Sequence, residues 1–290
     1  MSPNRGFQYR QSHIADAILH PNDYIQYMES LNRRVAAVTG ATGAIGCAIA
    51  ESIARLPNWE VVLIVRDRPR GEFTAEKISR TTGNGAIRIE IADLGVASDI
   101  ASLRGNWRGP LHALVNNAAV TPPKREQTAE GVEAQWGVNV LGYWRMAKAF
   151  RSVLAESAPS RLVNVASYWA GGLDLDDPEF KRRRYDNDSA YRQSKQADRM
   201  LSVLLADSWN TDGISVNACH PGDVRSRLSR NLGFGGSQTP AQGADTPSWL
   251  ATAEDAANIH GKWVSSRSAG VEPFAAGNLE RLESLLDSYG

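Results

Sequence analysis

The chain carries no excess charge of either sign and very little cysteine. Its 290 residues hold 32 Lys and Arg against 32 Asp and Glu, so no global field favours nucleic acid or an anionic membrane surface. The two cysteines, Cys47 and Cys219, lie in apolar segments without metal-ligand spacing, which indicates reduced core thiols. Any anion site must therefore be local, and we expect no nucleic-acid partner and no metal.

Long hydrophobic runs and a secretion signal are also missing. The N-terminus lacks the basic, apolar and cleavage regions of a signal peptide, and no apolar run approaches the ~18 residues of a membrane-spanning helix. The hydrophobic fraction of 42% and the charged fraction of 22% are typical of a soluble globular protein with a large core. These features predict a cytoplasmic protein that has no membrane partner.

Residues 1–32 form a polar and aromatic stretch that differs from the rest of the chain. Ile14, Ala17 and Ile18 have helical spacing, and Pro21 separates them from a second short pattern. We expect one or two short helices in an N-terminal extension. This extension is interpreted as a covering arm or a subunit contact, with a substrate cap as the alternative.

From Arg34 onward, short apolar runs alternate with helical patterns. Strands without polar alternation predict burial on both faces and hence a parallel sheet. Strands are expected near 34–39, 61–65, 86–91, 111–116, 161–166 and 214–219, with a seventh near 271–275, and helices near 44–56, 73–81, 96–104, 131–157 and 189–211. The pattern predicts an α/β protein with a doubly wound, Rossmann-type parallel sheet of about seven strands, in one domain over residues 33–290.

The first strand runs into a glycine-rich turn and then a helix, the context that a dinucleotide-binding site requires. Glycines let the backbone approach a pyrophosphate, whose charge lies at the positive end of the helix. The expected cofactor contacts in this turn are Gly40, Thr42, Gly43, Ala44, Ile45 and Gly46. A tight turn that binds no ligand is the alternative.

The ends of the next strands supply further candidates for the cofactor site. An acid after the second strand would hold the ribose of NAD, whereas the guanidinium of Arg66 suits the 2′-phosphate of NADP. Asp67, the next residue, could still reach a ribose. The sequence therefore favours NADP(H) over NAD(H), and the alternative for Arg66 is a surface arginine. Asp93 is placed to meet the adenine edge or only to start a turn. After the fourth strand, small residues would let the chain pass under the nicotinamide ribose, and the candidates there are Asn117, Ala118 and Ala119.

A tyrosine and a lysine, Tyr191 and Lys195, begin the long helix predicted over 189–211. Residues four apart share a helix face, so the phenol and the ammonium should point into one crevice. A free phenol has a pKa of about 10, and a neighbouring cation should lower it toward the range of a proton relay. Such a pair on a solvated helix is common by itself. Ser167 after the fifth strand and Asn139 in the preceding helix are expected at the same sheet edge, which makes the combination specific.

These motifs together resemble the short-chain dehydrogenase/reductase family over about residues 34–275, most closely its carbonyl-reductase-like and retinol-dehydrogenase-like members. The similar segments are Thr39 to Gly46, Asp93 and Leu94, Asn116 to Ala119, Val138 to Val140, Val163 to Ser167, Tyr191 to Lys195, and His220 to Gly222. Two departures are mild. Ala44 stands where the family usually has its second glycine, and Ala119 adds a methyl group near the cofactor.

The resemblance implies a role for each of these residues. Tyr191 would act as the general acid in reduction and the base in oxidation, and Ser167 would bind the substrate oxygen. Lys195 would lower the pKa of Tyr191 and bind the nicotinamide ribose, and Asn139 would hold a relay water. A turn after the sixth strand would close on the nicotinamide carboxamide, with Pro221, Gly222, Val224 and Ser226 as its contacts. Relatives also suggest a homodimer or homotetramer.

The favoured hypothesis is an NADP(H)-dependent oxidoreductase that reduces a ketone or aldehyde, or oxidises the secondary alcohol. The alternatives are a non-catalytic NADP(H)-binding regulatory protein and an epimerase or dehydratase that retains its cofactor. Residues 171–188 are interpreted as a substrate loop or an ordinary surface loop, and residues 226–250 as a mobile lid. Apolar residues in and near these segments indicate an apolar substrate pocket or else belong to the core: Trp169, Leu173, Phe180 and the stretch 228–249.

Overall fold

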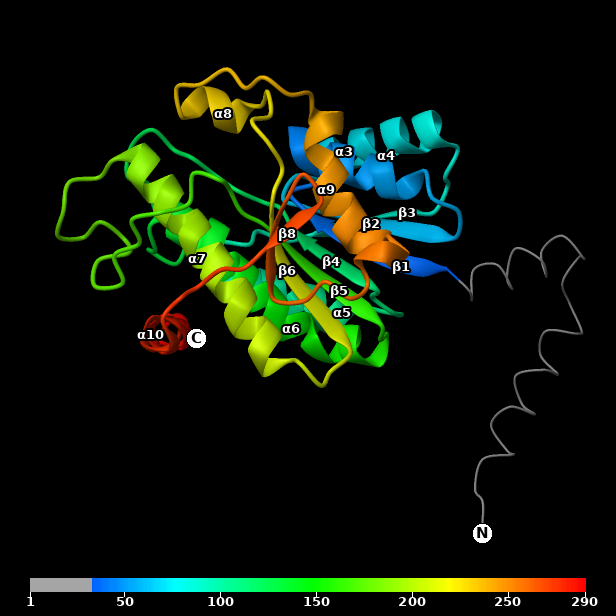
Figure 1. The fold of residues 1–290 in the computed structure, drawn as a ribbon. Coiled ribbons are helices and arrows are strands. Elements are labelled where there is room, and N and C mark those ends of the chain that lie inside the picture. The colour runs from blue at the N-terminus through cyan, green and yellow to red at the C-terminus, as the bar shows by residue number, and fades with distance from the viewer. Residues whose placement is uncertain (1–32) are drawn as a thin grey trace, which may run out of the picture.

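The computed structural model describes residues 33–290, which form one mixed sheet between two layers of helices (Figure 1). The strand order is β3-β2-β1-β4-β5-β6-β7-β8, and every neighbouring pair is parallel except β7 with β8. The strands are β1 (Arg34–Thr39), β2 (Trp59–Val65), β3 (Ile87–Ile91), β4 (Ala113–Asn116), β5 (Ser160–Val165), β6 (Ile214–His220), β7 (Lys262–Ser265) and β8 (Ser268–Gly270). This order confirms the predicted doubly wound α/β class. The helices predicted in residues 1–32 lie outside the described residues.

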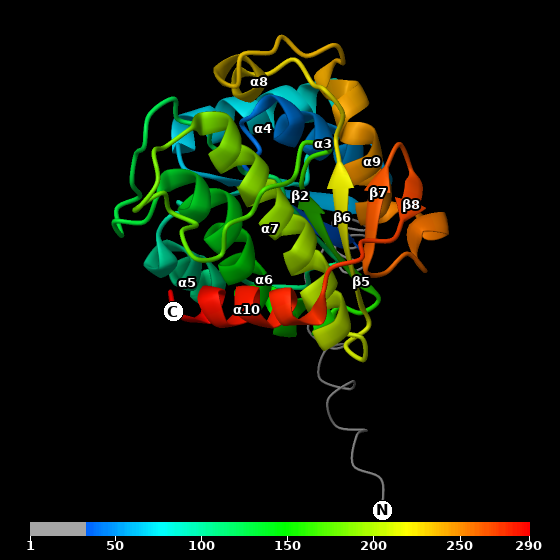
Figure 2. The same ribbon diagram turned by 60° about the vertical axis from the view of Figure 1, so that its left-hand side comes forward.

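Helices cover both faces of the sheet, as its uniformly apolar strands require (Figure 2). One layer holds α3 (Ala44–Ala54), α4 (Arg68–Thr82) and α9 (Pro240–Thr252), and the other holds α5 (Ala97–Asn106), α6 (Gly142–Glu156) and α7 (Asn187–Ser208). The short helix α8 (Arg227–Asn231) lies above the sheet, and α10 (Ala276–Asp287) packs on α7. Each layer has its own hydrophobic core against the sheet.

The seventh predicted strand was placed wrongly. The structure forms β7 and β8 instead, and residues 271–275 lie in the loop between β8 and α10. Only Val264 is fully buried in β7, so this strand near the sheet edge carries almost no apolar pattern for sequence reading to detect. Val271, which made the predicted segment look apolar, is 74% exposed.

Two long segments are divided more finely than the sequence indicated. The helix predicted over 131–157 contains a π-helical turn, Trp136–Leu141, before α6 begins. The segment 226–250 contains α8 and most of α9. Helix α9 packs on α3, and the Ser52 hydroxyl of α3 lies 3.1 Å from the Ser248 hydroxyl of α9. Buried residues of α9 belong to the hydrophobic core. Within this segment, the part outside the packed helices is therefore the loop that precedes Pro240.

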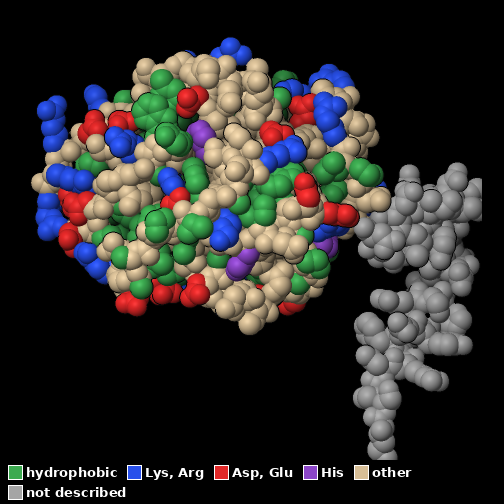
Figure 3. Space-filling view, viewed as in Figure 1, with side chains coloured by type: hydrophobic (Ala, Val, Ile, Leu, Met, Phe, Trp, Pro, Cys, Tyr) green, Lys and Arg blue, Asp and Glu red, His purple; other side chains and the backbone are tan. Residues whose placement is uncertain are grey.

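The surface agrees with the balanced charge of the sequence. Basic and acidic side chains are interspersed over the face shown in Figure 3, without a broad patch of one sign. Over residues 33–290, no helix is both long enough and apolar enough to cross a bilayer.

The core between α5 and α6 leads to a stability prediction. Phe150 is fully buried and meets Trp107 edge to face, with ring centroids 5.0 Å apart. We expect Phe150→Ala to lower the free energy of unfolding by about 3–5 kcal/mol in a urea titration followed by circular dichroism, because it removes apolar contacts and leaves a cavity. Phe73→Ala is the matched control, since Phe73 is 69% exposed and its loss should cost under about 0.5 kcal/mol. Equal losses in the two variants would contradict this packing.

Candidate active site

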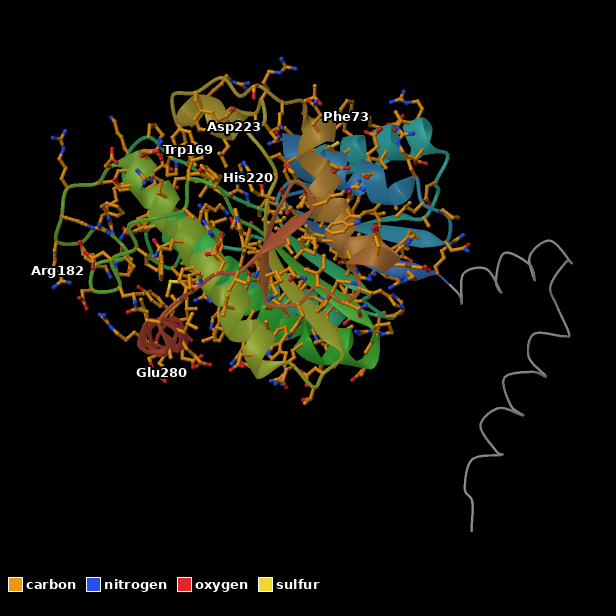
Figure 4. The ribbon with its side chains drawn as sticks, viewed as in Figure 1. Phe73, Trp169, Arg182, His220, Asp223 and Glu280 are labelled. Carbon is orange, nitrogen blue, oxygen red and sulfur yellow. The ribbon has the colours of Figure 1, made fainter. Side chains whose placement is uncertain are left out.

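A cavity of about 60 Å³ opens at the carboxyl edge of the sheet, between α7 and the loop that carries α8. Ser167, Tyr191 and Lys195 line it together. Figure 4 shows Trp169, His220 and Asp223, which also line it, between α7 and α8. The other lining residues include Ile45, Asn117, Ala119, Pro221, Gly222, Val224, Ser226, Leu228 and Phe234. Parallel strands bring these distant segments to a single edge.

The glycine turn between β1 and α3 has no room for side chains at two positions. Gly40 has a φ of +64°, and a Cβ there would lie 2.8 Å from the Cα of Ala118. A Cβ on Gly46 would lie 2.5 Å from the carbonyl oxygen of Gly40 and 2.6 Å from the side-chain nitrogen of Asn117. Both glycines therefore let the turn pack closely against the segment after β4, which fixes the backbone at the start of α3, where a pyrophosphate could bind.

Thr39 and Asn117 tie the turn to β4. The Thr39 hydroxyl accepts hydrogen bonds from the backbone N–H of Asn117 at 2.8 Å and of Ala118 at 3.0 Å. The Asn117 side chain donates to the Thr39 carbonyl at 2.9 Å. Thr39 was not among the predicted site residues, although its place at the strand end immediately before the turn could have suggested this supporting role.

Arg66 and Asp93 meet at the ends of β2 and β3. The guanidinium of Arg66 lies 3.6 Å from the Asp93 carboxylate, and the two side chains are 63% and 37% exposed. Asp93 also accepts a hydrogen bond from the backbone N–H of Gly95 at 2.9 Å, so it does start a turn. Leu94 is buried in the core below. Arg66 thus keeps an exposed guanidinium at the edge where a 2′-phosphate would lie.

Tyr191 is 9% exposed and shares the cavity with Ser167, which is 3% exposed. The pKa of Tyr191 is raised to about 12, mainly by burial and also by the carboxylates of Asp198, Asp223 and Asp188, while a side-chain hydrogen bond from Ser167 lowers it. Burial dominates this pKa, and the expected lowering by the neighbouring lysine stays a prediction. The phenol is therefore protonated at neutral pH.

Lys195 is held rigidly beneath the cavity. Its ammonium donates to the carbonyl of Val165 at 2.9 Å and to the carboxylate of Asp198 at 2.8 Å, and it lies 5.0 Å from the ring centroid of Tyr143. The Lys195 side chain is 3% exposed and that of Asp198 is fully buried. An ammonium has three N–H donors, so one stays available toward the cavity.

Asn139 lies in the π-helical turn behind the cavity and is fully buried. Its side chain accepts from the backbone N–H of Val120 at 2.9 Å and donates to the Val120 carbonyl and the Ser194 hydroxyl, each at 3.2 Å. It does not line the cavity itself. The π-turn, a feature often found at functional sites, is what turns Asn139 toward the segment after β4.

The segment after β6 forms the roof of the cavity. Gly222 has a left-handed backbone conformation, with a φ of +93°. Val224 forms an isolated parallel β-bridge with Gln238. The Ser226 hydroxyl caps α8 by accepting a hydrogen bond from the backbone N–H of Ser229 at 3.0 Å. Phe234 stacks on Trp169 across the opening, with ring centroids 5.4 Å apart and planes 5° from parallel. Sequence reasoning had placed Trp169 at the substrate pocket and had singled out the stretch containing Phe234, but not their contact.

The loop 171–188 is anchored away from the cavity. Asp177 accepts backbone N–H groups of three successive residues from Lys181 to Arg183, and the Gln193 side chain donates to the Pro178 carbonyl at 2.6 Å. Phe180 is 4% exposed and packs on Tyr185. No residue of this loop is among those lining the cavity, so its part in substrate binding stays a prediction.

The remaining predicted cofactor residues lie beside a second hollow. Thr42, Gly43 and Ala44 line an open groove that runs between α3, α4 and the start of α9. Ala44 begins α3, and its methyl group is accommodated at the groove rather than in the turn. The departure from the usual glycine at this position therefore leaves the backbone cradle intact.

Comparisons with known proteins agree with this geometry. A family model described as short chain dehydrogenase matches residues 34–234. Retinol dehydrogenase 13 from Mus musculus is 33% identical over 249 residues, which cover 78% of this chain and 73% of the relative.

Solved structures share the fold. An uncharacterized protein from Mycobacterium paratuberculosis has a TM-score of 0.73 at 24% identity and covers 89% of this chain and 93% of its own. A Beutenbergia cavernae protein provisionally assigned as an NAD(P) dependent gluconate 5-dehydrogenase, with bound NADP, has a TM-score of 0.64 at 28% identity, covering 82% and 96%.

The glycine turn gives a direct test of the cofactor cradle. We expect Gly46→Ala to weaken NADPH binding at least about tenfold in a fluorescence titration, because the new methyl group would push the Gly40 carbonyl and Asn117 out of place. Gly85→Ala is the control, since a Cβ there meets nothing within 4 Å. Unchanged affinity in a folded Gly46→Ala protein would place the cofactor elsewhere.

Proposed function

Because the chain belongs to the short-chain dehydrogenase family, we propose that it reduces a ketone or aldehyde with NADP(H), or oxidises the corresponding secondary alcohol. The observation that carries this proposal is the convergence of Ser167, Tyr191 and Lys195 on one small cavity beside the glycine turn. A phenol, a hydroxyl and an ammonium at the carboxyl edge of such a sheet form a proton-transfer site next to a dinucleotide cradle.

The residues present fit a nicotinamide dinucleotide. The backbone of the glycine turn at the start of α3 would take the pyrophosphate, and Arg66 would take the 2′-phosphate. Lys195 would donate its remaining N–H to the nicotinamide ribose. When bound, the reduced cofactor supplies the hydride that reaches the carbonyl carbon. The preference for NADP over NAD rests on Arg66 and is supported by the bound NADP in the Beutenbergia cavernae structure.

Tyr191 supplies the proton to the carbonyl oxygen. Its phenol is protonated at neutral pH and can therefore donate a proton as a general acid. Ser167 would donate a hydrogen bond to the same oxygen and orient the carbonyl. The proton arrives as the hydride adds to the carbon, so the alcohol forms without an uncompensated alkoxide. The relay water expected at Asn139 stays a prediction.

The walls of the cavity support an apolar substrate. Trp169 and Phe234 form a stacked aromatic pair at its opening, and Leu228 and Val224 add aliphatic surface. A relative named retinol dehydrogenase is compatible with such a substrate. The homodimer or homotetramer and the cytoplasmic location inferred from the sequence stay predictions.

The catalytic role of Tyr191 is tested by its loss. We expect Tyr191→Phe to lower kcat/KM for carbonyl-dependent NADPH oxidation at least about 100-fold, because the proton donor is removed while the ring remains. Tyr168→Phe is the matched control, since Tyr168 is 74% exposed and adjacent to Ser167. Unchanged turnover in Tyr191→Phe would overturn the assignment. Cofactor that copurifies, with no net change in nicotinamide absorbance, would favour an epimerase or dehydratase.

The cofactor preference is tested at Arg66. We expect Arg66→Ala to raise the KM for NADPH about 10- to 100-fold and to leave the KM for NADH within about threefold, because a charge-assisted contact to the 2′-phosphate is lost. Arg68→Ala, two residues further along the exposed surface, is the control. A wild-type protein with the lower KM for NADH would contradict the assignment of NADP(H).

A further inference from the structure

A buried carboxylate beside Lys195 has no part in the proposed reaction so far. Asp198 lies one helical turn beyond Lys195 on α7, with its Oδ2 2.8 Å from the Lys195 Nζ and no exposure to solvent. Its other oxygen, Oδ1, is buried without a hydrogen-bond partner among the described residues. Burial raises the pKa of Asp198 to about 7, and the charge and hydrogen bond of Lys195 lower it, so Lys195 is the counter-ion that allows this carboxylate to ionise.

The pair changes the electrostatics of the cavity. An isolated ammonium beside Tyr191 would favour the phenolate, as the sequence had suggested. Asp198 is in direct contact with Lys195, so its negative charge opposes that of the ammonium, and the carboxylate itself raises the pKa of the Tyr191 phenol. The tyrosine is therefore kept in its proton-donating form.

The other ionisable groups around this pair come from four elements. Tyr143 on α6 and Cys219 on β6 are fully buried beside it, and burial raises the pKa of each, so both stay neutral. The groups that face Tyr191 are Ser167 after β5, Asp223 after β6, and Asp188 at the start of α7. Of the carboxylates that face Tyr191, only Asp198 touches Lys195 in the described structure.

We propose that Asp198 is a positioning residue that neutralises Lys195 and thereby keeps Tyr191 in its proton-donating form. This inference rests on the proposed function, since it assumes that Tyr191 is the proton donor. Asp198 acts through Lys195 and through its field at Tyr191, and it touches neither the cavity nor the reacting atoms. In the oxidative direction the same field would be a hindrance, because the phenolate is needed there as the base.

The test replaces the carboxylate with a neutral group of the same shape. Asp198→Asn keeps an oxygen that can accept from Lys195 but removes the charge, so the pKa of Tyr191 should fall. We expect the alkaline limb of the pH profile for reductive kcat/KM, and the limb for alcohol oxidation, both to move down by about one pH unit or more.

The control is Asp207→Asn, an exposed carboxylate at the far end of the same helix, which should shift neither limb. Asp198→Ser, also neutral, should reproduce the shift if the asparagine variant folds poorly. The wild-type protein gives an independent test. As the pH is raised, its rate of reduction should not begin to decline until the pH exceeds about 9. An alkaline fall below that pH, or a folded Asp198→Asn protein with unmoved limbs, would overturn the proposal.

These outcomes are distinct from a failure of the proposed function. If Tyr191→Phe abolishes turnover while Asp198→Asn leaves both limbs in place, the reaction stands and Asp198 only holds Lys195. If Tyr191→Phe leaves turnover intact, the proposed function itself is contradicted, whatever the result for Asp198→Asn.

Discussion

Parallel pairing of the central strands is the constraint on which the rest of the structure depends. The register that sets Val38 of β1 opposite Val115 of β4, and Val115 opposite Val163 of β5, brings the carboxyl ends of these strands to one edge. Because the chain must cross over after each strand, every crossover starts at that edge, where turns are free to carry polar groups. The glycine turn, Ser167 and the roof of the cavity are all segments of this kind.

Beneath that edge, buried polar side chains fix α7 against the sheet. Asn116 of β4 donates to Asn164 of β5 at 3.0 Å, Asn164 donates to the hydroxyl of Ser202 at 2.9 Å, and Ser202 donates to the carbonyl of Asp198 at 2.8 Å. A broken member would leave a buried polar group unsatisfied, so this chain of bonds allows little movement. The position of Lys195 is therefore set by groups in two strands and its own helix.

Much of the architecture could be predicted because it follows from local patterns. The first six strands along the chain and the long helices were located to within a few residues, since apolar runs and helical periodicity are local in sequence. The strand pair at the edge escaped because β7 has one buried apolar residue, Val264, and the π-turn around Asn139 escaped because its residues still read as a helix. Helix α9 was interpreted as part of a lid because the glycines before it, Gly233, Gly235 and Gly236, and Pro240 at its start resemble a loop.

The sequence by itself determined which residue types meet at the site, because motif order along alternating strands and helices dictates which segments share an edge. It also identified Arg66 as the candidate for cofactor choice. Only the tertiary structure decided the electrostatic state of the site. Whether a phenol is protonated depends on its burial and on every charge within a few ångströms. For Tyr191 the charge of Asp198 comes from the same helix, but that of Asp223 comes from a distant segment, and neither the burial of the phenol nor this second charge follows from the local sequence.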